Sequence, residues 1–569
     1  MITTIAKSGF KRSVFLIIPI ILLLSTCLPP MQGLTDEVLM PKWYGTVMVE
    51  LATTTIYLTL PQSSPKGRGE CKVYSGRYMG CGLQVAAMLV LTYHLMYALV
   101  VDIIMRGIPD MRFLYIKGVF DNPTGFALHT CVLVAMIGTN RPSSRPPSMG
   151  EAFIEITGGR TIRQVSIILV WILTLLSAVM VVLSGCRTGM VCMAVIILLM
   201  LYREARRWVK TDAVRLWGGI IGGGLLLAVV LYVFSVKQES TGGRQFILER
   251  TWELIEERPL TGYGWHGFER EYMVQQADYF KSHPNSPAAW YADEISHPLN
   301  EFLYLWVDFG VIAPILLLLL FAIPYYTYYR KKDLLLGQMT LPLTVVLVFS
   351  MTSYPFLYPL PWVVVALTYI VMMRKPIRRL QQRYRKTVMV ASIGVCIAGL
   401  ALTIWEMTCE HEWTKLNRAV ERHYTAAVID RYDKLSSHYH NNPRFLYSYM
   451  YAQYKVSRLD EVLGTYQQLH QYADTYDMEL LAGDTYRHLQ QHNDALQHYE
   501  NAMWMCPVRF VPLEGMMQTY RDNGDSFRAD SIAQVILEKP VKIPSPQVEE
   551  IKRKARETVK GSGGKSSKL

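Results

Sequence analysis

Long apolar blocks separated by polar loops make up most of the first 405 residues, and they restrict the fold more than any other feature. Each block holds roughly 15 to 25 residues, about the length that a helix needs to cross a hydrocarbon core ~30 Å thick. Eleven blocks can be recognised, at 14–28, 46–60, 80–105, 124–138, 165–183, 188–202, 216–236, 299–325, 334–353, 356–373 and 387–405. We take the first as an uncleaved span, because many spans follow it. The pattern predicts an all-α, polytopic membrane protein with about 11 transmembrane helices.

The basic residues predict which loops face the cytoplasm. Lys and Arg are concentrated in every second connection, as the positive-inside rule requires of cytoplasmic loops. The main exception is the connection between the third and fourth blocks, which carries Arg106, Arg112 and Lys117 on the opposite side. The net charge of +12 therefore reflects topology and does not indicate a nucleic-acid partner. We expect a cytoplasmic N-terminus, with the long polar segment 237–298 and the C-terminal region outside.

The region after residue 405 is polar and aromatic, and it repeats with a period of about 33 to 34 residues. Apolar residues and tyrosines recur at aligned positions: Val428, Val462, Ala495 and Ala529, and Tyr432, Tyr466 and Tyr499. The spacing resembles the tetratricopeptide repeat, in which small residues let paired helices approach and aromatic residues fill the space between pairs. We expect helical repeats over 406–547 that either bind a protein partner or steady the membrane part. From 548 to 569 we expect a basic helix that runs into a disordered tail.

Three arginines on the expected outer side could bind an anionic substrate. Arg187 lies in a very short turn between the fifth and sixth blocks, where an arginine is costly unless it is paired, solvated or able to snorkel to the headgroups. Arg244 follows two glycines and precedes a predicted helix over 245–257, whose N-terminal amides would favour an anion. Arg250 could share that face, although an ion pair with Glu253 within the helix is the simpler interpretation.

His297 stands at the start of the eighth block, where a histidine could act as a general base near neutral pH. Lone histidines are more often structural, and His283 occurs in a similar Ser-His-Pro setting. Asn300 and Glu301 follow within one expected helical turn and could orient the ring. The sequence contains no metal-ligand motif, nucleophile elbow or Walker sequence, so we expect neither a metal nor another cofactor.

The arginines and the histidine together suggest one kind of chemistry. Arginine forks match phosphate oxygens, and without a metal they must stabilise the charge that develops on a pyrophosphate leaving group. A nearby histidine could take the proton of an attacking hydroxyl. The set fits the transfer of a group from a lipid pyrophosphate to an acceptor alcohol.

Four short motifs resemble the O-antigen ligase superfamily, which contains O-antigen ligases, O-antigen polymerases and protein O-oligosaccharyltransferases. They are Gly243-Arg244 with Trp252, the run 257–264, the run 297–303 and the run 308–312, and the resemblance covers mainly residues 180–320. It implies a multi-pass glycosyltransferase of the bacterial inner membrane that takes a glycan from undecaprenyl pyrophosphate without a metal.

The resemblance also implies roles for single residues. Arg187 corresponds to the first essential arginine of the family, Arg244 to the arginine of the outer loop, and His297 to the essential histidine. The sequence departs from the family pattern after His297, because Pro298 and Leu299 precede Asn300, whereas many members have the asparagine directly after the histidine.

These observations predict a membrane glycosyltransferase domain over 1–405, with its long periplasmic loop at 237–298, followed by a periplasmic repeat domain. The acceptor would be a lipid A–core sugar or the hydroxyl of a protein Ser or Thr. Three other functions fit the same pattern: an O-antigen polymerase, a polytopic transporter or flippase of a lipid-linked glycan, and an inactive scaffold that recruits partners through the repeats.

Overall fold

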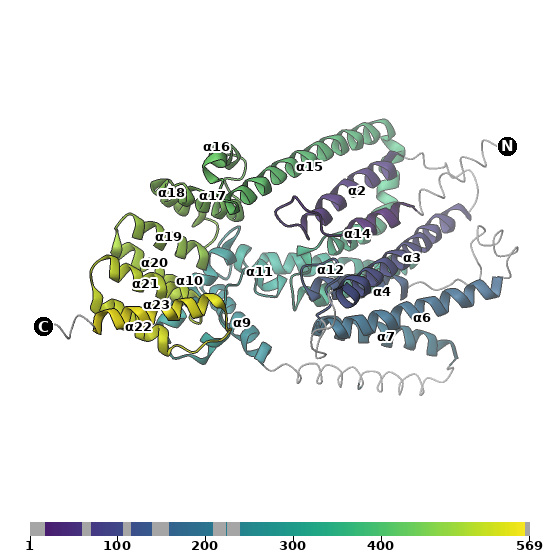
Figure 1. Cartoon of the computed structure of the whole chain (residues 1–569). Helices are drawn as coiled ribbons and strands as arrows, with labels where there is room; N and C mark the ends of the chain where they lie inside the picture. The colour runs from purple at the N-terminus through teal and green to yellow at the C-terminus, as the bar shows by residue number, and fades with distance from the viewer. Residues whose placement is uncertain are drawn as a thin grey trace. The chain divides into compact units, whose positions relative to one another are not determined.

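The computed structural model describes residues 17–59, 70–105, 115–138, 159–208, 224 and 239–563. Within these ranges every regular element is a helix and no strand occurs (Figure 1), which confirms the predicted all-α fold. Contacts between residues divide the chain into two compact units. We call residues 1–236 with 317–411 the membrane unit, and residues 237–316 with 412–569 the loop–tail unit.

The membrane unit is built from apolar helices. A helix over 17–25 is followed by α2 (Met40–Thr59), α3 (Glu70–Ala98), η1 (Leu99–Met105), α4 (Pro123–Gly138), α6 (Gly159–Ser184), α7 (Arg187–Trp208), α12 (Ile312–Lys331), α13 (Leu334–Ser350), η3 (Pro355–Leu357), α14 (Pro359–Arg383) and α15 (Arg385–Glu421). The residues of α12 and α15 are divided between the two units.

Several of these helices can cross a membrane. Five stretches of the described residues are long and apolar enough: Gly82–Met105, Ile167–Ser184, Ile312–Lys331, Pro359–Arg383 and Arg385–Glu421. Helices α4 and α13 are apolar but shorter. The prediction of a polytopic helical membrane protein is therefore confirmed. The predicted seventh span at 216–236 lies outside the described residues apart from Gly224, so the total of eleven stays a prediction.

Helix α4 forms the interior of the membrane unit. Every residue from Gly125 to Ile137 is buried, and the helix packs against α3, α6, α7 and α13. A helix that is apolar around its whole circumference is typical of such a central position. Because α7 packs on α4, this central helix also supports the helix at whose start Arg187 lies.

The predicted eighth span, 299–325, is wrong as one continuous helix. It is divided into α11 (Glu301–Phe309) and α12, with a break at Gly310, whose φ is 72°. A Cβ on Gly310 would lie 1.9 Å from the carbonyl oxygen of Leu260, so the chain that passes there leaves no room for a side chain. Only α12 is a candidate span, and α11 belongs to the loop–tail unit, where Val307 is buried.

The loop–tail unit joins two regions that are far apart in the sequence. Its loop contains α9 (Glu239–Glu257), α10 (Gly267–Ser282), η2 (Pro287–Trp290) and α11. Its tail contains α16 (Thr425–Ser436), α17 (Pro443–Lys455), α18 (Leu459–Leu469), α19 (Tyr476–His488), α20 (His492–Met505), α21 (Val511–Asp522), α22 (Ser526–Glu538) and α23 (Pro546–Gly563). Consecutive tail helices pack on each other, α17 on α18, α19 on α20, and α21 on α22 (Figure 1).

Small and aromatic residues determine the packing of the tail. Tyr499 of α20 is buried between Gly483 and Gly515, where a Cβ would lie 2.8 Å and 2.4 Å from its ring. A larger residue at either position would push the helices apart. The four aligned apolar positions of the predicted repeat are all buried: Val428, Val462, Ala495 and Ala529. The assignment of the tail to the tetratricopeptide repeat stays a prediction.

The last helix, α23, lies in the region where we expected a basic helix, and it packs against the rest of the tail. Val548, Ile551, Ala555 and Val559 pack in one hydrophobic cluster with α21 and α22, and Ile551 is only 1% exposed. Their spacing of three and four residues forms an apolar stripe on a helix whose other positions are mostly charged. The net basic composition of this region concealed the apolar stripe. Because the stripe is packed, the ordered structure continues well past residue 548. Residues 564–569 lie outside the described part.

One hydrophobic core is shared by the loop and the tail. Helix α10 packs on α20, and the cluster combines apolar residues from both regions: Ile247, Leu254, Ile255, Phe268, Tyr272, Met273, Ala277 and Val307 from the loop, and Tyr476, Ala502, Met505 and Cys506 from the tail. The predicted boundary at residue 405 grouped the loop with the membrane helices. The contacts group it with the tail, and α15 runs through residue 405 without a break.

Candidate active site

The turn over 259–264 packs its backbone on the end of α11. The Gly264 amide donates to the carbonyl oxygen of Asp308 at 2.7 Å. Gly262 has a φ of 65°, and a Cβ there would lie 2.5 Å from the same oxygen. Only glycine allows both the backbone angle and this close approach. The turn therefore fixes α11 and supports the segment that precedes it.

His297 lies in the non-helical segment that precedes α11, and three groups contact its ring. Nδ1 accepts a hydrogen bond from the Leu299 amide at 3.0 Å, and Nε2 lies 3.7 Å from a carboxylate oxygen of Glu301. The ring stacks on Tyr304 with 4.7 Å between centroids. Because the Leu299 amide must donate, Nδ1 carries no proton, and a neutral ring has its proton on Nε2, facing Glu301. The contacts therefore fix both the orientation and the tautomer of the ring.

The expected position of His297 on a helix is wrong. Helix α11 starts four residues later. Asn300 caps it, because its Oδ1 accepts hydrogen bonds from the amides of Phe302 and Leu303 at 2.9 Å and 3.2 Å. Glu301 still contacts the ring because Leu299 has a left-handed φ of 57° and turns the chain back over the start of the helix. Of the two residues expected to orient His297, Glu301 faces the ring and Asn300 stabilises the helix end.

Arg244 lies inside α9 and not before it. The helix starts at Glu239, so the amides of Gly243 and Arg244 come after the first turn, whose free N–H groups favour anions. The Arg244 side chain is exposed. A Cβ on Gly242 would lie 3.4 Å from the ring of Tyr291, so this glycine lies against η2. Any anion binding here would therefore come from the arginine side chain, not from the helix end.

The side chain of Arg250, six residues further on, is engaged in contacts with other residues of the protein. Its guanidinium forms two contacts of 2.8 Å with the carboxylate of Glu253, and it lies 4.1 Å from the ring centroid of Tyr279. The side chain is 11% exposed. This geometry agrees with the simpler interpretation of Arg250 as a member of an ion pair within α9, and its contact with Tyr279 joins α9 to α10.

Arg187 is the first residue of α7, directly after the turn that ends α6. Gly185 has a φ of 72°, and the Cys186 amide donates to Ser184 Oγ at 3.3 Å, which closes the turn. Thr188 Oγ1 lies 2.9 Å from Thr352 Oγ1 and links the start of α7 to the chain after α13. The Arg187 side chain is partly buried.

The candidate residues are divided between the two units. Arg244, Arg250 and His297 belong to the loop–tail unit, where α11 packs against α9. Arg187 belongs to the membrane unit.

Asp308 is a residue that the sequence motifs contained but to which we assigned no role. It is 3% exposed, and its Oδ1 accepts the amide of Phe268 at 3.0 Å, at the start of α10. Burial raises the pKa of the Asp308 carboxyl to about 7; Glu269 acts in the same direction, and the Phe268 amide opposes the shift. A carboxyl inside an apolar run is costly to bury without a partner, and this was the available signal.

Stability should depend on pH through Asp308. The pKa of Asp308 in the folded protein lies above its ordinary value of 3.8, so its contribution to stability is complete below about pH 4 and is lost as the pH rises to about 7. The loss of stability is at most about 4 kcal/mol. Thermal unfolding of the whole protein in detergent should show a smaller decrease in Tm between pH 5 and 8 for Asp308→Asn than for the unchanged protein. Asp278→Asn, at an exposed carboxylate, is the control. Equal pH dependence in all three proteins would refute the assignment.

The fold and the site define a polytopic helical membrane protein that carries its candidate histidine and an exposed arginine in a compact unit built on a long loop. Residues 172–321 match the family model described as O-antigen ligase, and this range contains Arg187, Arg244, His297 and Asp308. This part of the chain is therefore similar to the O-antigen ligase family, which supports a role in the transfer of lipid-linked glycans. A search of curated proteins found no match to the chain.

Proposed function

We propose that the protein transfers a glycan from undecaprenyl pyrophosphate to an acceptor hydroxyl at the periplasmic face of the bacterial inner membrane. The observation that carries this proposal is the His297–Glu301 pair inside the O-antigen ligase domain. The ring is oriented by the Leu299 amide and Tyr304, and its Nε2 faces a carboxylate that is 9% exposed. With its proton on Nε2, the ring orients the Glu301 carboxylate, and this carboxylate can accept the proton of an attacking hydroxyl as the new glycosidic bond forms.

The arginines would act on the leaving group. As the bond between the sugar and the pyrophosphate breaks, charge develops on the phosphate oxygens, and arginine forks stabilise it. Arg244 supports this role because its side chain is exposed on α9. Arg187 supports it through its place at the start of α7 and inside the matched domain. Arg250, which pairs with Glu253, would hold α9 in place and would not bind the substrate.

We propose that the acceptor is either a lipid A–core sugar or the hydroxyl of a protein Ser or Thr. Purified protein in liposomes, supplied with an undecaprenyl-pyrophosphate glycan and each acceptor in turn, would separate them. We expect glycan attached to one acceptor, with release of undecaprenyl pyrophosphate. Chain growth on the lipid carrier alone would indicate a polymerase. Glycan that crosses the bilayer without being transferred would indicate a transporter and refute the proposal.

Arg244→Ala should lower kcat/KM for the lipid-linked donor by roughly 10- to 100-fold, the effect of losing a hydrogen bond of about 1.5–3 kcal/mol to a charged group. Arg244→Lys should recover little, because an ammonium lacks the bidentate fork. The same liposome assay provides the measurement. Arg528→Ala, at an exposed arginine of α22, is the matched control and should retain full activity. Equal activity of the Arg244→Ala and Arg528→Ala proteins would exclude Arg244 from donor binding.

A further inference from the structure

The segment that carries His297 has no regular structure of its own, so its position must come from its neighbours. Between η2 and α11 the chain runs through residues 291–300 without a helix. Ala292 is 2% exposed in a cluster with Phe246 and Phe280, and Trp504 of the tail packs against the same cluster. The first support of the segment is therefore an apolar contact to which the tail contributes.

Gln276 of α10 connects the segment to the tail. The residue is completely buried, and its Nε2 donates to the carbonyl oxygen of Asp293 at 3.2 Å and to that of Met505 at 2.6 Å. Met505 is the last residue of α20, where helix carbonyls have no partner within the helix. One side-chain amide thus satisfies the end of α20 and holds the backbone four residues before His297.

Arg509 of the tail contacts the same residue, Asp293, through its side chain. Its guanidinium donates to the Asp293 carboxylate at 2.6 Å and lies 4.3 Å from the ring centroid of Tyr476. The ring keeps the planar guanidinium in a fixed orientation. Asp293 is therefore bound through its backbone by Gln276 and through its side chain by Arg509.

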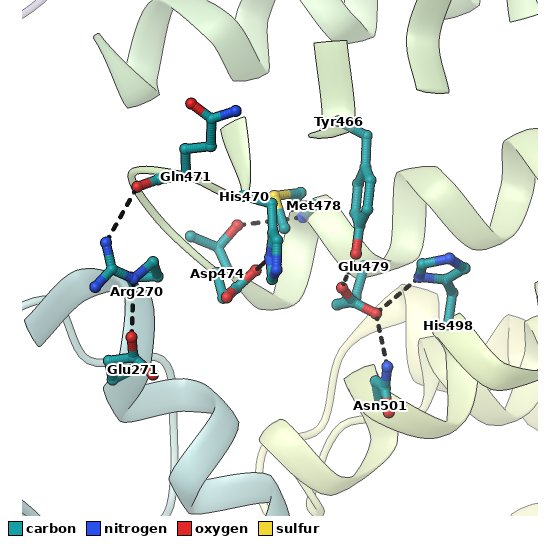
Figure 2. Close-up of polar contacts among 11 residues, drawn as sticks. Arg270, Glu271, Tyr466, His470, Gln471, Asp474, Met478, Glu479, His498 and Asn501 are labelled. Carbon is teal, nitrogen blue, oxygen red and sulfur yellow. Dashed lines mark hydrogen bonds and ion pairs between the residues drawn. The ribbon is translucent and has the colours of Figure 1, made fainter. Parts of the chain in front are cut away.

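The part of the tail that makes these contacts is itself rigidly connected (Figure 2). The carboxylate of Glu479 is 3% exposed and accepts hydrogen bonds from Tyr466 at 2.7 Å, His498 at 2.9 Å and Asn501 at 3.2 Å, which joins α18, α19 and α20. Asn501 also accepts from Lys281 of α10 at 3.3 Å. Helix α20 is thus joined to α18, to α19 and to the loop.

A second group of contacts joins the two regions at the other end of α10. The Arg270 guanidinium donates to the carbonyl oxygen of Gln471 at 3.3 Å (Figure 2), and the Asp474 amide donates to the carbonyl oxygen of Glu269 at 3.2 Å. Helix α10 is consequently held along its length by the tail.

We propose that the tail is an intramolecular brace that positions the His297 segment, and that Gln276 and Arg509 are positioning residues for the transfer reaction. The inference rests on the proposed role of His297. It assigns to the tail a function in the reaction itself, which does not require a bound protein partner. Loss of either contact would free the segment to move, and a reactive group displaced by about 1 Å can lose about 100-fold in rate.

The test compares Arg509→Ala and Gln276→Ala with Arg553→Ala in the full-length protein. Arg553 is a matched tail arginine, paired only within α23 among the contacts described, with Glu550 and Glu557. Hydrogen–deuterium exchange of residues 291–300 should become faster in the first two proteins and stay unchanged in the third. In the liposome assay kcat should decrease roughly 10-fold, short of the ~100-fold cost of a full misplacement, while KM for the donor stays the same. Arg509→Lys should restore part of kcat.

A charge exchange provides the decisive comparison. The double variant Asp293→Arg with Arg509→Asp rebuilds the ion pair in reverse and should slow the exchange of 291–300 again relative to Arg509→Ala. Unchanged exchange in Arg509→Ala and Gln276→Ala would overturn the brace, whatever the activity. If the protein without any substitution transferred no glycan, the proposed function would be refuted. The two outcomes can be told apart, because the exchange measurement does not depend on activity.

Discussion

A His297→Ala protein is expected to transfer glycan about 10²- to 10⁴-fold more slowly than the unchanged protein, the range that a positioned acid or base contributes. The ring contacts the Leu299 amide, the face of Tyr304 and the carboxylate of Glu301. Its removal leaves that carboxylate without the Nε2 that faces it, and the attacking hydroxyl without the oriented pair. The measurement is kcat in liposomes that contain the lipid-linked donor and a reactive acceptor.

The sequence offers a matched control in His283. This histidine also stands between serine and proline, but it is exposed, stacks on Tyr279 and lies 3.1 Å from that residue's carbonyl oxygen through Nδ1. His283→Ala should retain activity and Tm. Glu301→Gln separates the two members of the pair, because it keeps the size of the side chain and removes its charge. If His297→Ala and His283→Ala lowered kcat equally, His297 would have no special place in the reaction.

Gly310→Ala is expected to destabilise the loop–tail unit by more than about 4 kcal/mol, a cost reserved for severe steric conflicts. The new Cβ would lie 1.9 Å from the Leu260 carbonyl oxygen, and the φ of 72° is unfavourable for any residue with a side chain. Both the turn over 259–264 and the end of α11 would have to move. At about 2–4 °C for each kcal/mol in a unit of this size, Tm should decrease by roughly 10 °C or more, and glycan transfer should be lost with it.

Gly464 is a useful comparison because the same substitution should act in the opposite direction. It lies inside α18, and no atom lies within 4 Å of the position of a new Cβ. Gly464→Ala should stabilise the protein by roughly 0.5–1 kcal/mol, since alanine loses less entropy than glycine in a helix. If the Gly310→Ala protein had the same Tm as the protein without the substitution, the backbone of Leu260 could not lie as close to Gly310 as described.

The sequence was sufficient to predict features that depend on local patterns. Apolar blocks long enough for a membrane predicted the helical, polytopic fold, and the short connection between the fifth and sixth blocks predicted a tight turn, although Arg187 lies just after it and not in it. The aligned apolar and aromatic positions of the tail predicted its tightly packed helices, because Tyr499 requires glycines opposite its ring. These features follow from spacing and from residue size, which a sequence contains directly.

Features that depend on distant contacts could not be predicted in the same way. The helix break at Gly310 exists because Leu260 passes there, and the apolar run around it looked like an uninterrupted span. The turn at Leu299 that returns His297 to Glu301 uses a left-handed residue that is not a glycine. The grouping of the loop with the tail depends on contacts such as the one between Gln276 and Met505, which no local pattern records.

The shared core also determines when the protein can complete its folding during synthesis. Gln276 and Met505 are 229 residues apart, and the helices α12 to α15 are made between them. At about 5–20 residues per second, roughly 10 to 50 s separate the synthesis of the two partners. During that interval the apolar face of α10 has no tail to cover it. A ribosome that stops before α19 and α20 would release a chain whose loop lacks the tail part of the shared core. With the proposed brace missing, we expect such a chain to be inactive.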